Sequence, residues 1–507
     1  MADYDLAIIG GGINGAGIAR DAAGRGLRVL LVEQHDLGSG TSSASTKLIH
    51  GGLRYLEHGA FRLVREALSE RELLLRVAPH IVRPMRFVLP ASPGPRSPLL
   101  IRIGLLLYDW LGARRILPAT RTIDLTHHQA GQPLQRRFNT GFEYSDCAVD
   151  DARLVVLNAL DAAQRGATVR TRTRVVRAER EDDWRLILNA QGHREVVTAR
   201  VLVNAAGPWV GVVNETVLRL DGIGPLRLAK GSHIVVPKLF DHGRGYIFQN
   251  SDKRVVFALP FAEDFTLIGT TDEPFVGDLD AVAPSADEVI YLCRAVNEFF
   301  RTRVEPHQVV WAFAGVRSLY DDGRGKVEDV TREYHLTLDE RYRQAPVLTV
   351  YGGKITTYRR LAEDALDMLA HLFQLHRAFT ATAPLPGGDF HWNAIEGQVT
   401  QTRQSWPFLT EAETWRLLRA YGTRVERILA GLKRREDMAP FFGPLSAAEV
   451  RYLRAHEWAR TVDDVLWRRS KLGLSLGATE KAALAQFMAS EAAAAASRPP
   501  AKGEARG

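Results

Sequence analysis

The chain opens on a glycine motif: residues 5–15 read DLAIIGGGING, an apolar strand pattern that runs into GxGxxG spacing. A helical stretch follows, and a second apolar strand pattern, LRVLLVE, ends at Glu33. Gly10 permits a tight turn, Gly12 lets the backbone approach a pyrophosphate, and Gly15 lets the helix pack against the strand. Glu33 is placed to accept hydrogen bonds from a ribose. The spacing therefore predicts a βαβ unit that binds an adenine dinucleotide.

The rest of the chain carries no second GxGxxG between a strand and a helix. An enzyme that passes electrons from NAD(P)H to a flavin often has two such sites. A single site indicates that the reductant is a small substrate and that the dinucleotide is a bound FAD.

The length of 507 residues predicts two or three domains. Apolar strands run into glycine turns again at residues 201–209 and 347–353, a β-rich stretch covers 226–275, and the Pro/Gly run PLPGG precedes a helical pattern. We expect a discontinuous FAD-binding domain from residues 1–75, 143–225 and 345–385, a substrate domain from 76–142 and 226–344, a helical domain over 388–490, and a disordered tail over 491–507.

Cysteine content and net charge limit the cellular compartment and the kinds of partner that are expected. Two cysteines, Cys147 and Cys293, cannot make a disulfide framework, a CxxC centre or a cysteine metal site, so a reducing cytosol and no metal are expected. No signal peptide precedes the first strand pattern. The net charge of +7 suits nucleic acid, an anionic membrane face or an anionic substrate. The basic residues are scattered without a long tract, which argues against nucleic acid.

One apolar stretch, PLLIRIGLLLYDWLG at residues 98–112, is too short to span a bilayer. It carries Trp110 near its end and is followed by Arg114 and Arg115. That pattern fits a helix lying in a membrane interface through an apolar strip from Leu99 to Trp110. It fits a buried core helix equally well, and the two interpretations stay open at this point.

Several segments together resemble one family, the aerobic FAD-dependent glycerol-3-phosphate dehydrogenases. They are TSSASTKLIHGGLRYLEHGAFRLVREALSERELL, GFEYSDCAVDDARLV, VNAAGPWV, KGSHIVVP, IGTTD, FAGVRSL and YGGKITTYRRLAE, and the likeness covers nearly all of residues 3–490. Ser318 is a visible departure, because relatives often have Pro after the Val-Arg pair. The resemblance implies an α/β fold: a D-amino-acid-oxidase-like FAD-binding Rossmann domain, an antiparallel β-rich substrate domain and a C-terminal all-helical cap.

The resemblance also implies the reaction, which is oxidation of sn-glycerol 3-phosphate to dihydroxyacetone phosphate by hydride transfer to FAD, with electrons then passed to membrane quinone. Such a reaction needs cationic groups for a phosphate dianion and a base for the C2 hydroxyl proton. His50 and His233 are the base candidates, and the resemblance favours His233. Family motifs assign catalytic roles to His233, Arg317 and Lys354 and substrate binding to Arg54, Tyr55, Thr270 and Arg332.

The same motifs assign residues to the cofactor. They are Gly10, Gly12, Asn14, Gly15, Glu33, Ser42, Ser43, Lys47, His50, Val175, Ala206, Gly207, Gly352, Gly353, Thr356 and Thr357. The Ser/Thr cluster also suits the start of a helix, which is compatible with cofactor contact.

Partners follow from the implied reaction. Glycerol 3-phosphate, membrane quinone and an anionic membrane surface are expected, with the protein cytoplasmic and peripherally bound to the inner face of the cell membrane, and a homodimer is left open. Three alternatives remain: an oxidase of the same substrate that uses oxygen, an amine or amino-acid oxidase on the same fold, and a flavin-containing RNA-binding protein suggested by the pI of 9.4.

Overall fold

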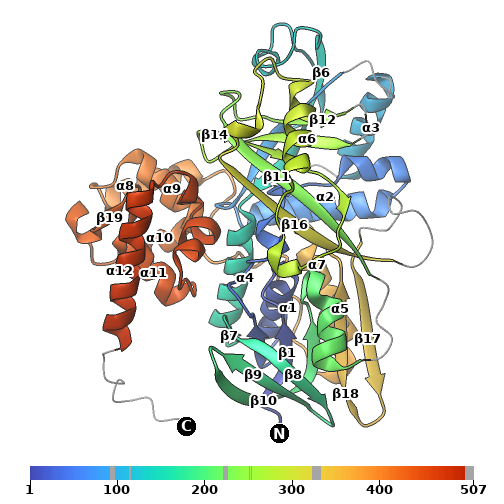
Figure 1. Cartoon of the computed structure of the whole chain (residues 1–507), viewed down its shortest axis with the longest axis vertical. Helices are drawn as coiled ribbons and strands as arrows, with labels where there is room; N and C mark the ends of the chain where they lie inside the picture. The colour runs from blue at the N-terminus through green and yellow to red at the C-terminus, as the bar shows by residue number, and fades with distance from the viewer. Residues whose placement is uncertain are drawn as a thin grey trace. The chain divides into compact units, whose positions relative to one another are not determined.

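The computed structural model divides into two compact units, Met1–Ile395 and Glu396–Gly507 (Figure 1). It describes residues 1–91, 98–112, 116–220, 226–250, 252, 254–321 and 333–496. The first unit contains two large β-sheets with their helices, and the second is mainly helical. This arrangement confirms the mixed α/β class predicted from the sequence.

The first sheet is built around the N-terminal strand β1 (Tyr4–Ile9). Its parallel neighbours are β10 (His193–Asn204) and β2 (Val29–Val32), and the parallel order continues with β18 (Gln344–Tyr351) and β7 (Thr168–Arg170). Strands β1 and β2 are apolar and largely buried, as expected for parallel strands covered on both faces. Segments far apart in the sequence therefore present their carboxyl ends at one edge of this sheet.

Antiparallel strands complete the first sheet. Strand β17 (His335–Arg341) pairs with β18, and β9 (Trp184–Ala190) pairs with both β10 and β8 (Arg174–Arg180). Trp184 is fully buried here, and its indole N–H donates to the carbonyl of Pro346 at 2.8 Å. The indole therefore ties the β8–β9 hairpin to the start of β18.

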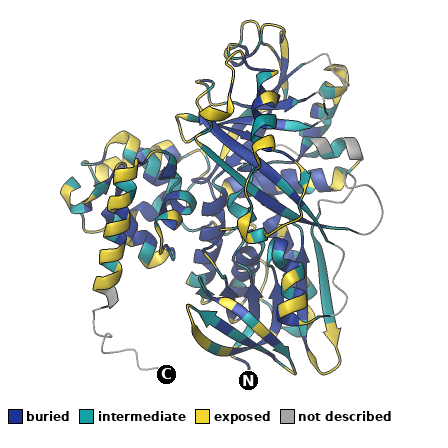
Figure 2. Cartoon of the chain, viewed as in Figure 1, coloured by how far each residue is buried: buried dark blue, intermediate teal, exposed yellow. Residues whose placement is uncertain are grey.

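The turn from β1 into helix α1 (Ile13–Gly24) is tightly packed. Gly10 has a φ of +110°, a conformation that favours glycine. A Cβ on Gly15 would collide with the carbonyl oxygen of Gly10, so the helix begins directly against the strand. Helix α1 packs on α4 (Asp151–Gln164) and α7 (Tyr358–Met368), and Figure 2 shows it almost entirely buried. This packing holds the N-terminus of α1 at the carboxyl edge of the sheet.

The second sheet is mainly antiparallel, in the order β15-β11-β14-β13-β12-β4-β6-β3, with β16 on β11 and β5 on β6. Only β12 and β4 pair in parallel among its described strands. The bounds are β3 (Leu48–Ile49), β4 (Val82–Pro90), β5 (Arg121–Asp124), β6 (Thr140–Val149), β11 (Leu226–Pro237), β12 (Gly245–Gln249), β13 (Val255–Phe261), β14 (Phe265–Gly269), β15 (Glu273–Pro274) and β16 (Trp311–Tyr320).

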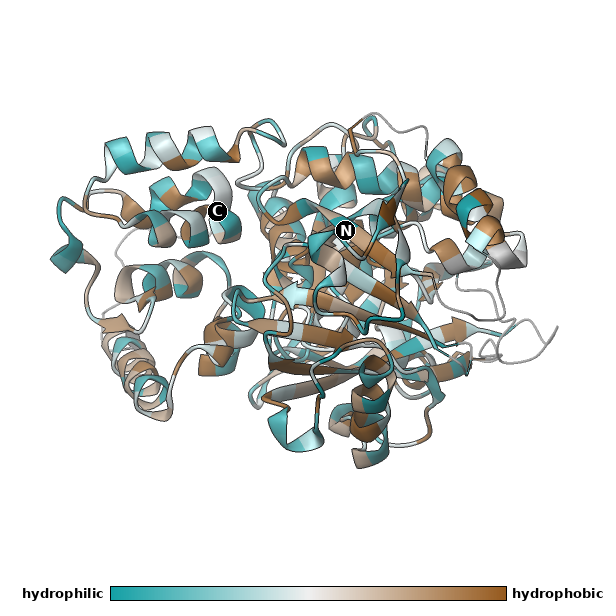
Figure 3. Ribbon diagram, turned by 90° about the horizontal axis from the view of Figure 1, so that it is seen from above, coloured by the Kyte–Doolittle hydropathy of each residue, from teal (hydrophilic) through white to brown (hydrophobic). Residues whose placement is uncertain are grey.

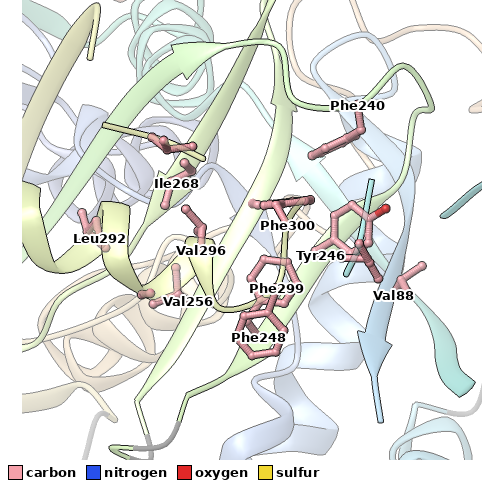
Figure 4. Close-up of a cluster of buried hydrophobic side chains, with 14 of the residues drawn as sticks. Val88, Phe240, Tyr246, Phe248, Val256, Ile268, Leu292, Val296, Phe299 and Phe300 are labelled. Carbon is pink, nitrogen blue, oxygen red and sulfur yellow. The ribbon is translucent and has the colours of Figure 1, made fainter. Parts of the chain in front are cut away.

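An aromatic core fills the space between this sheet and helix α6 (Ala286–Asn297) (Figure 4). Phe248 stacks on Phe299 with ring centroids 4.2 Å apart, and Phe300 packs edge-on against Phe248 and Tyr246. Aromatic pairs of this kind stabilise a core beyond the burial of their area, by about 0.5–1.5 kcal/mol each. The core makes the second sheet a rigid wall for whatever lies on its other side.

Helices α2 (Phe61–Val77) and α3 (Pro98–Leu111) pack against each other. Helix α3 has two unlike faces: Leu105 and Tyr108 are buried, whereas its outer side chains are 53–77% exposed. The exposed apolar set, called here the outer face of α3, is Leu99, Leu100, Ile103, Leu106 and Trp110. The interpretation of this stretch as a wholly buried core helix is therefore wrong. The prediction that Leu105 belongs to an exposed apolar strip is also wrong. Within the described residues, no helix is long and apolar enough to cross a membrane.

The second unit has its own apolar core. Its helices carry both hydrophobic and polar residues (Figure 3), and hydrophobic residues from all of them pack into one cluster. Their bounds, with those of one short strand pair, are α8 (Ile395–Ser405), α9 (Glu411–Tyr421), α10 (Val425–Leu429), β19 (Phe441–Phe442), β20 (Leu445–Ser446), α11 (Ala447–His456) and α12 (Ala478–Ala496). The sequence predicts a disordered tail from residue 491, but α12 continues to Ala496 because alanine strongly favours helix.

Candidate active site

A cleft lies at the carboxyl ends of the parallel strands of the first sheet. Its walls come from the residues that follow β1, β2, β10 and β18, together with residues of β16 in the second sheet. Ligands bind at this edge in open α/β sheets. The cleft contains the glycine turn predicted from the N-terminal motif.

The glycine turn and the start of α1 form one end of the cleft. Ser42 reaches over the helix start, and its Oγ accepts the N–H of Ile13 at 3.0 Å. A Cβ on Gly12 would lie 3.1 Å from that Oγ, so a side chain at this position would crowd Ser42. Asn14 donates to the carbonyl of Gly352 at 3.0 Å, and among the described residues its buried Oδ1 atom has no hydrogen-bond partner. That oxygen is available to a donor in the cleft.

Glu33 stands where the ribose contact is predicted, at the end of β2 and in the cleft wall. Its two carboxylate oxygens accept the N–H groups of Gly11 at 2.7 Å and His35 at 2.8 Å. Burial raises the pKa of Glu33, and these two hydrogen bonds oppose the shift. An ionised carboxylate offers about four acceptor positions, so two remain for ribose hydroxyls.

Apolar side chains line the cleft beside Glu33. Val175 is among those predicted, and Trp209, Val212, Val213 and Val217 are additional. Trp209 follows the Gly turn of Ala206 and Gly207, and the motif NAAGPW was its available sequence signal. A pocket of this kind suits a flat aromatic base.

Basic side chains gather toward Gly352 and Gly353. The Lys354 ammonium lies 4.1 Å from the centre of the Tyr55 ring, and Arg317 donates to Asp272 at 3.0 Å while remaining about one-third exposed. All three of Tyr55, Lys354 and Arg317 line the cleft. Thr270 is close to Arg317, because a Cβ placed on Gly231 would approach both side chains within 3.2 Å.

His233 lies in β11, buried beside the cleft, and does not line it. Its Nε2 is 3.0 Å from the Thr46 hydroxyl, and its buried Nδ1 has no hydrogen-bond partner among the described residues. Burial lowers the pKa of His233 to about 3, and the nearby charges of Lys47 and Arg317 add to the shift. The imidazole is therefore neutral at neutral pH.

Comparison with known proteins identifies the family. Residues 5–359 match the FAD dependent oxidoreductase family, and residues 378–498 match the C-terminal domain of alpha-glycerophosphate oxidase. The chain is 51% identical to the glycerol-3-phosphate dehydrogenase of Pseudomonas aeruginosa, over 96% of this chain and 95% of that protein. It is 49% identical to the D-erythritol 1-phosphate dehydrogenase of Brucella abortus, over 95% and 97%.

A solved structure supports the same family assignment. The glycerol-3-phosphate dehydrogenase from Bacillus halodurans, complexed with FAD, superposes with a TM-score of 0.78 at 27% identity, covering 96% of this chain and 90% of that one. The chain belongs to the FAD-dependent glycerol-3-phosphate dehydrogenase family. Membership of this family confirms the fold class and the cofactor predicted from the sequence.

The cleft fits the FAD of this family. The lack of a side chain at Gly12 suits close approach of the pyrophosphate, and the helix N-terminus suits its charge. The Oδ1 atom of Asn14, which has no hydrogen-bond partner among the described residues, suits a donor on the cofactor. The cofactor residues that line the cleft are Gly10, Gly12, Asn14, Glu33, Ser42, Val175, Ala206, Gly207, Gly352 and Gly353.

Six residues assigned to the cofactor by the family motifs are not among those that line the cleft: Gly15, Ser43, Lys47, His50, Thr356 and Thr357. Thr356 and Thr357 are buried. Burial also lowers the pKa of His50. The contact of these six residues with FAD stays a prediction.

Among the residues assigned to the cofactor, Lys47 has the contacts that fit this role least. Its ammonium pairs with Asp151 at 2.8 Å and donates to the carbonyl of Ser43 at 2.9 Å. It also lies 4.9 Å from the centre of the Phe313 ring. Sequence reasoning missed Asp151, although it stands in the family segment DCAVDDARLV. Lys47 thus anchors the loop that carries Ser42 and Ser43.

Two predicted substrate residues cannot be placed. Arg332 and the side chain of Arg54 lie outside the described residues. Two residues that the sequence did not single out, Thr46 and Asp272, hold His233 and Arg317 respectively.

Proposed function

We propose that the protein oxidises sn-glycerol 3-phosphate at C2 to dihydroxyacetone phosphate, with FAD accepting the hydride. The observation that carries this proposal is the presence of two basic side chains, Arg317 and Lys354, in the cleft wall beside Gly352 and Gly353. A phosphate dianion calls for several cationic groups, whereas the carboxylate of an amino acid needs one arginine. The family match supports the same substrate class.

Each polar group then has a role. Arg317, held by Asp272, binds the phosphate with its planar fork. Lys354 adds a second charge and, with Tyr55, contacts the substrate. His233 is the proposed acceptor of the C2 hydroxyl proton, because its ring is neutral and its buried Nδ1 atom has no hydrogen-bond partner among the described residues. Bound FAD supplies the hydride acceptor.

The test is anaerobic reduction of the flavin. Glycerol 3-phosphate is added to the FAD-loaded protein without oxygen, and flavin absorbance is followed in a stopped-flow instrument. Prompt bleaching is expected, and an equal concentration of glycerol should bleach the flavin far more slowly. A flavin that glycerol 3-phosphate leaves oxidised would overturn the proposal.

A second candidate is a longer polyol phosphate, because the relative from Brucella abortus is named a D-erythritol 1-phosphate dehydrogenase. The same experiment with that compound compares the two substrates directly. The substrate with the higher ratio of bleaching rate to apparent Kd is the physiological class. Peroxide yield during aerobic turnover separates a dehydrogenase from an oxidase that uses oxygen.

We further propose that electrons pass to quinone in an anionic membrane, which the protein reaches from the cytoplasmic side through the outer face of α3. Five large apolar side chains exposed on one short helix form a surface suited to a bilayer interface. Arg102, which is exposed on the same helix, supplies positive charge. The predicted basic flank, Arg114 and Arg115, lies outside the described residues.

The docking test uses two matched double variants. Ile103→Asp with Leu106→Asp places charge on the outer face of α3, and binding to vesicles containing anionic lipid should be lost. Val196→Asp with Val276→Asp changes exposed valines elsewhere and should leave binding intact. Quinone reduction should fall only in the first variant, while anaerobic bleaching stays normal in both. Undiminished vesicle binding by the α3 variant would contradict the proposal.

Sedimentation of the FAD-loaded protein in detergent tests the homodimer left open by the sequence.

A further inference from the structure

A buried hydroxyl on the inner face of helix α3 connects the helix to two other segments of the chain. Tyr108 is 1% exposed, and its hydroxyl donates to the Asp146 carboxylate, whose two oxygens are both 2.9 Å away. The same hydroxyl accepts the backbone N–H of Gly51 at 2.8 Å. Asp146 is held in turn by Arg71 at 2.7 Å. The tyrosine hydroxyl therefore has a fixed position and a fixed direction.

The partner of Tyr108 belongs to a short segment, residues 50–52, called here the His50 turn. The backbone N–H of His50 donates to the Thr356 hydroxyl at 3.3 Å. Gly51 has no room for a side chain, because a Cβ there would lie 2.6 Å from Leu68 and 2.7 Å from the Tyr108 hydroxyl. The His50 turn is therefore held on one side by α3 and on the other by the segment before α7.

The His50 turn connects directly to the basic end of the cleft. The short 3₁₀ helix that follows it, Leu53–His58, carries Tyr55. Thr356, on its other side, comes two residues after Lys354. The Tyr55 ring and the Lys354 ammonium meet at 4.1 Å. Both members of this pair are thus positioned by elements that the His50 turn contacts.

We propose that Tyr108 is a positioning residue for substrate binding: its hydroxyl holds the His50 turn, and the turn sets Tyr55 against Lys354. Tyr108 does not line the cleft, so it acts through the turn. The inference rests on the proposed function, because it requires Tyr55 and Lys354 to contact the substrate phosphate. His233 is held by Thr46 and Phe313, outside the His50 turn, so substrate binding should suffer more than hydride transfer.

The experiment is Tyr108→Phe in the FAD-loaded protein, followed by anaerobic flavin bleaching at several glycerol 3-phosphate concentrations. A lost buried hydrogen bond should raise the apparent Kd about tenfold. The limiting bleaching rate should change less than about twofold, with normal FAD content. Tyr144→Phe is the matched control, since that buried ring packs edge-on against Tyr108 at 5.9 Å. The apparent Kd of the Tyr144→Phe variant should equal that of the parent protein.

A second variant approaches the same hydrogen bond from the other side. Gly51→Ala pushes on the Tyr108 hydroxyl and on Leu68 while keeping the tyrosine, and the two changes together should raise Kd no further than the stronger one alone. Leu105→Ala, a packing change on the same helix face, should lower the melting temperature without changing Kd.

Three outcomes would overturn the inference. They are an unchanged Kd in both Tyr108→Phe and Gly51→Ala, additive effects in the double variant, and an equal rise in Kd for Leu105→Ala. Failure of the proposed function looks different, because the parent protein itself would then show no bleaching by glycerol 3-phosphate.

Discussion

The imidazole of His233 lies flat on the ring of Phe313, with the ring centroids 4.9 Å apart and the planes 10° from parallel. The two residues face each other across β11 and β16, so the stacking follows from the register of the sheet. The Lys47 ammonium lies 4.9 Å from the centre of the same Phe313 ring, beside its ion pair with Asp151. This arrangement fixes the plane of the imidazole.

The first prediction concerns catalysis by His233. His233→Asn should slow flavin reduction by roughly 10²–10⁴-fold if the imidazole is the general base. FAD content should stay normal, because His233 is not one of the predicted cofactor contacts. His242→Asn, a change to a histidine bonded to Tyr246, serves as the control and should keep the parental rate. A His233 variant that bleaches at the parental rate would move the role to Lys354 or His50.

The second prediction concerns pH. Because burial lowers the pKa of His233 to about 3, its ring should stay neutral from about pH 5 to 8. Histidine NMR of the labelled protein, assigned by loss of the signal in His233→Asn, measures this directly. The folded pKa lies below the unfolded value, so this residue's contribution to stability should decrease as the pH falls below 6.5. If the His233 ring instead titrated near pH 6.5 in the folded protein, the prediction of a lowered pKa for His233 would be refuted.

The third prediction concerns Arg317. Arg317→Lys keeps the charge but loses the planar fork that binds phosphate through two parallel hydrogen bonds. Its ratio of bleaching rate to Kd should fall more for glycerol 3-phosphate than for glycerol, which lacks the phosphate. Equal losses with both substrates would show that Arg317 supports the structure or the flavin instead.

The fourth prediction concerns FAD binding by Glu33. Glu33→Ala should weaken FAD binding by about 1.5–3 kcal/mol, the contribution of hydrogen bonds to a charged group. Measurement of FAD affinity by fluorescence checks this value. Glu195→Ala removes a partly exposed carboxylate from the same sheet and should leave the affinity unchanged. Parental affinity in the Glu33 variant would count against the ribose contact.

The fifth prediction concerns acid stability. Burial opposes ionisation of Glu143, but hydrogen bonds from Arg244, Arg86 and Arg121 outweigh it and lower its pKa to about 2. The stabilisation is present above the unfolded value of 4.5 and is lost as the pH falls toward 2. Glu143→Gln should cost about 3 kcal/mol at neutral pH.

Denaturant melts of Glu143→Gln at a series of pH values should show this difference shrinking below about pH 4.5. Asp241→Asn, at a side chain 97% exposed, should show neither effect. A difference that stays constant down to pH 2 would mean that the carboxylate charge is not what stabilises the site.

The sequence was most informative where function makes demands on the local backbone. Gly10 and Gly15 mark the turn and the helix start by spacing alone, and both are needed for the packing observed. The partners of buried charges were not predictable in this way. Lys47 pairs with Asp151 and His233 with Thr46, across long stretches of chain. Such pairs depend on how strands and helices meet, which no single motif encodes.

Strand β1 has consequences for how the protein is made. It lies between β2 and β10, and the cleft beside it is completed by residues that follow β18. At roughly 5–20 residues per second, a ribosome needs tens of seconds to proceed from β1 to β18. During that time the apolar N-terminal strand has no complete sheet to join. Nascent chains should therefore depend on chaperones, and FAD should enter only after residue 354 has left the ribosome.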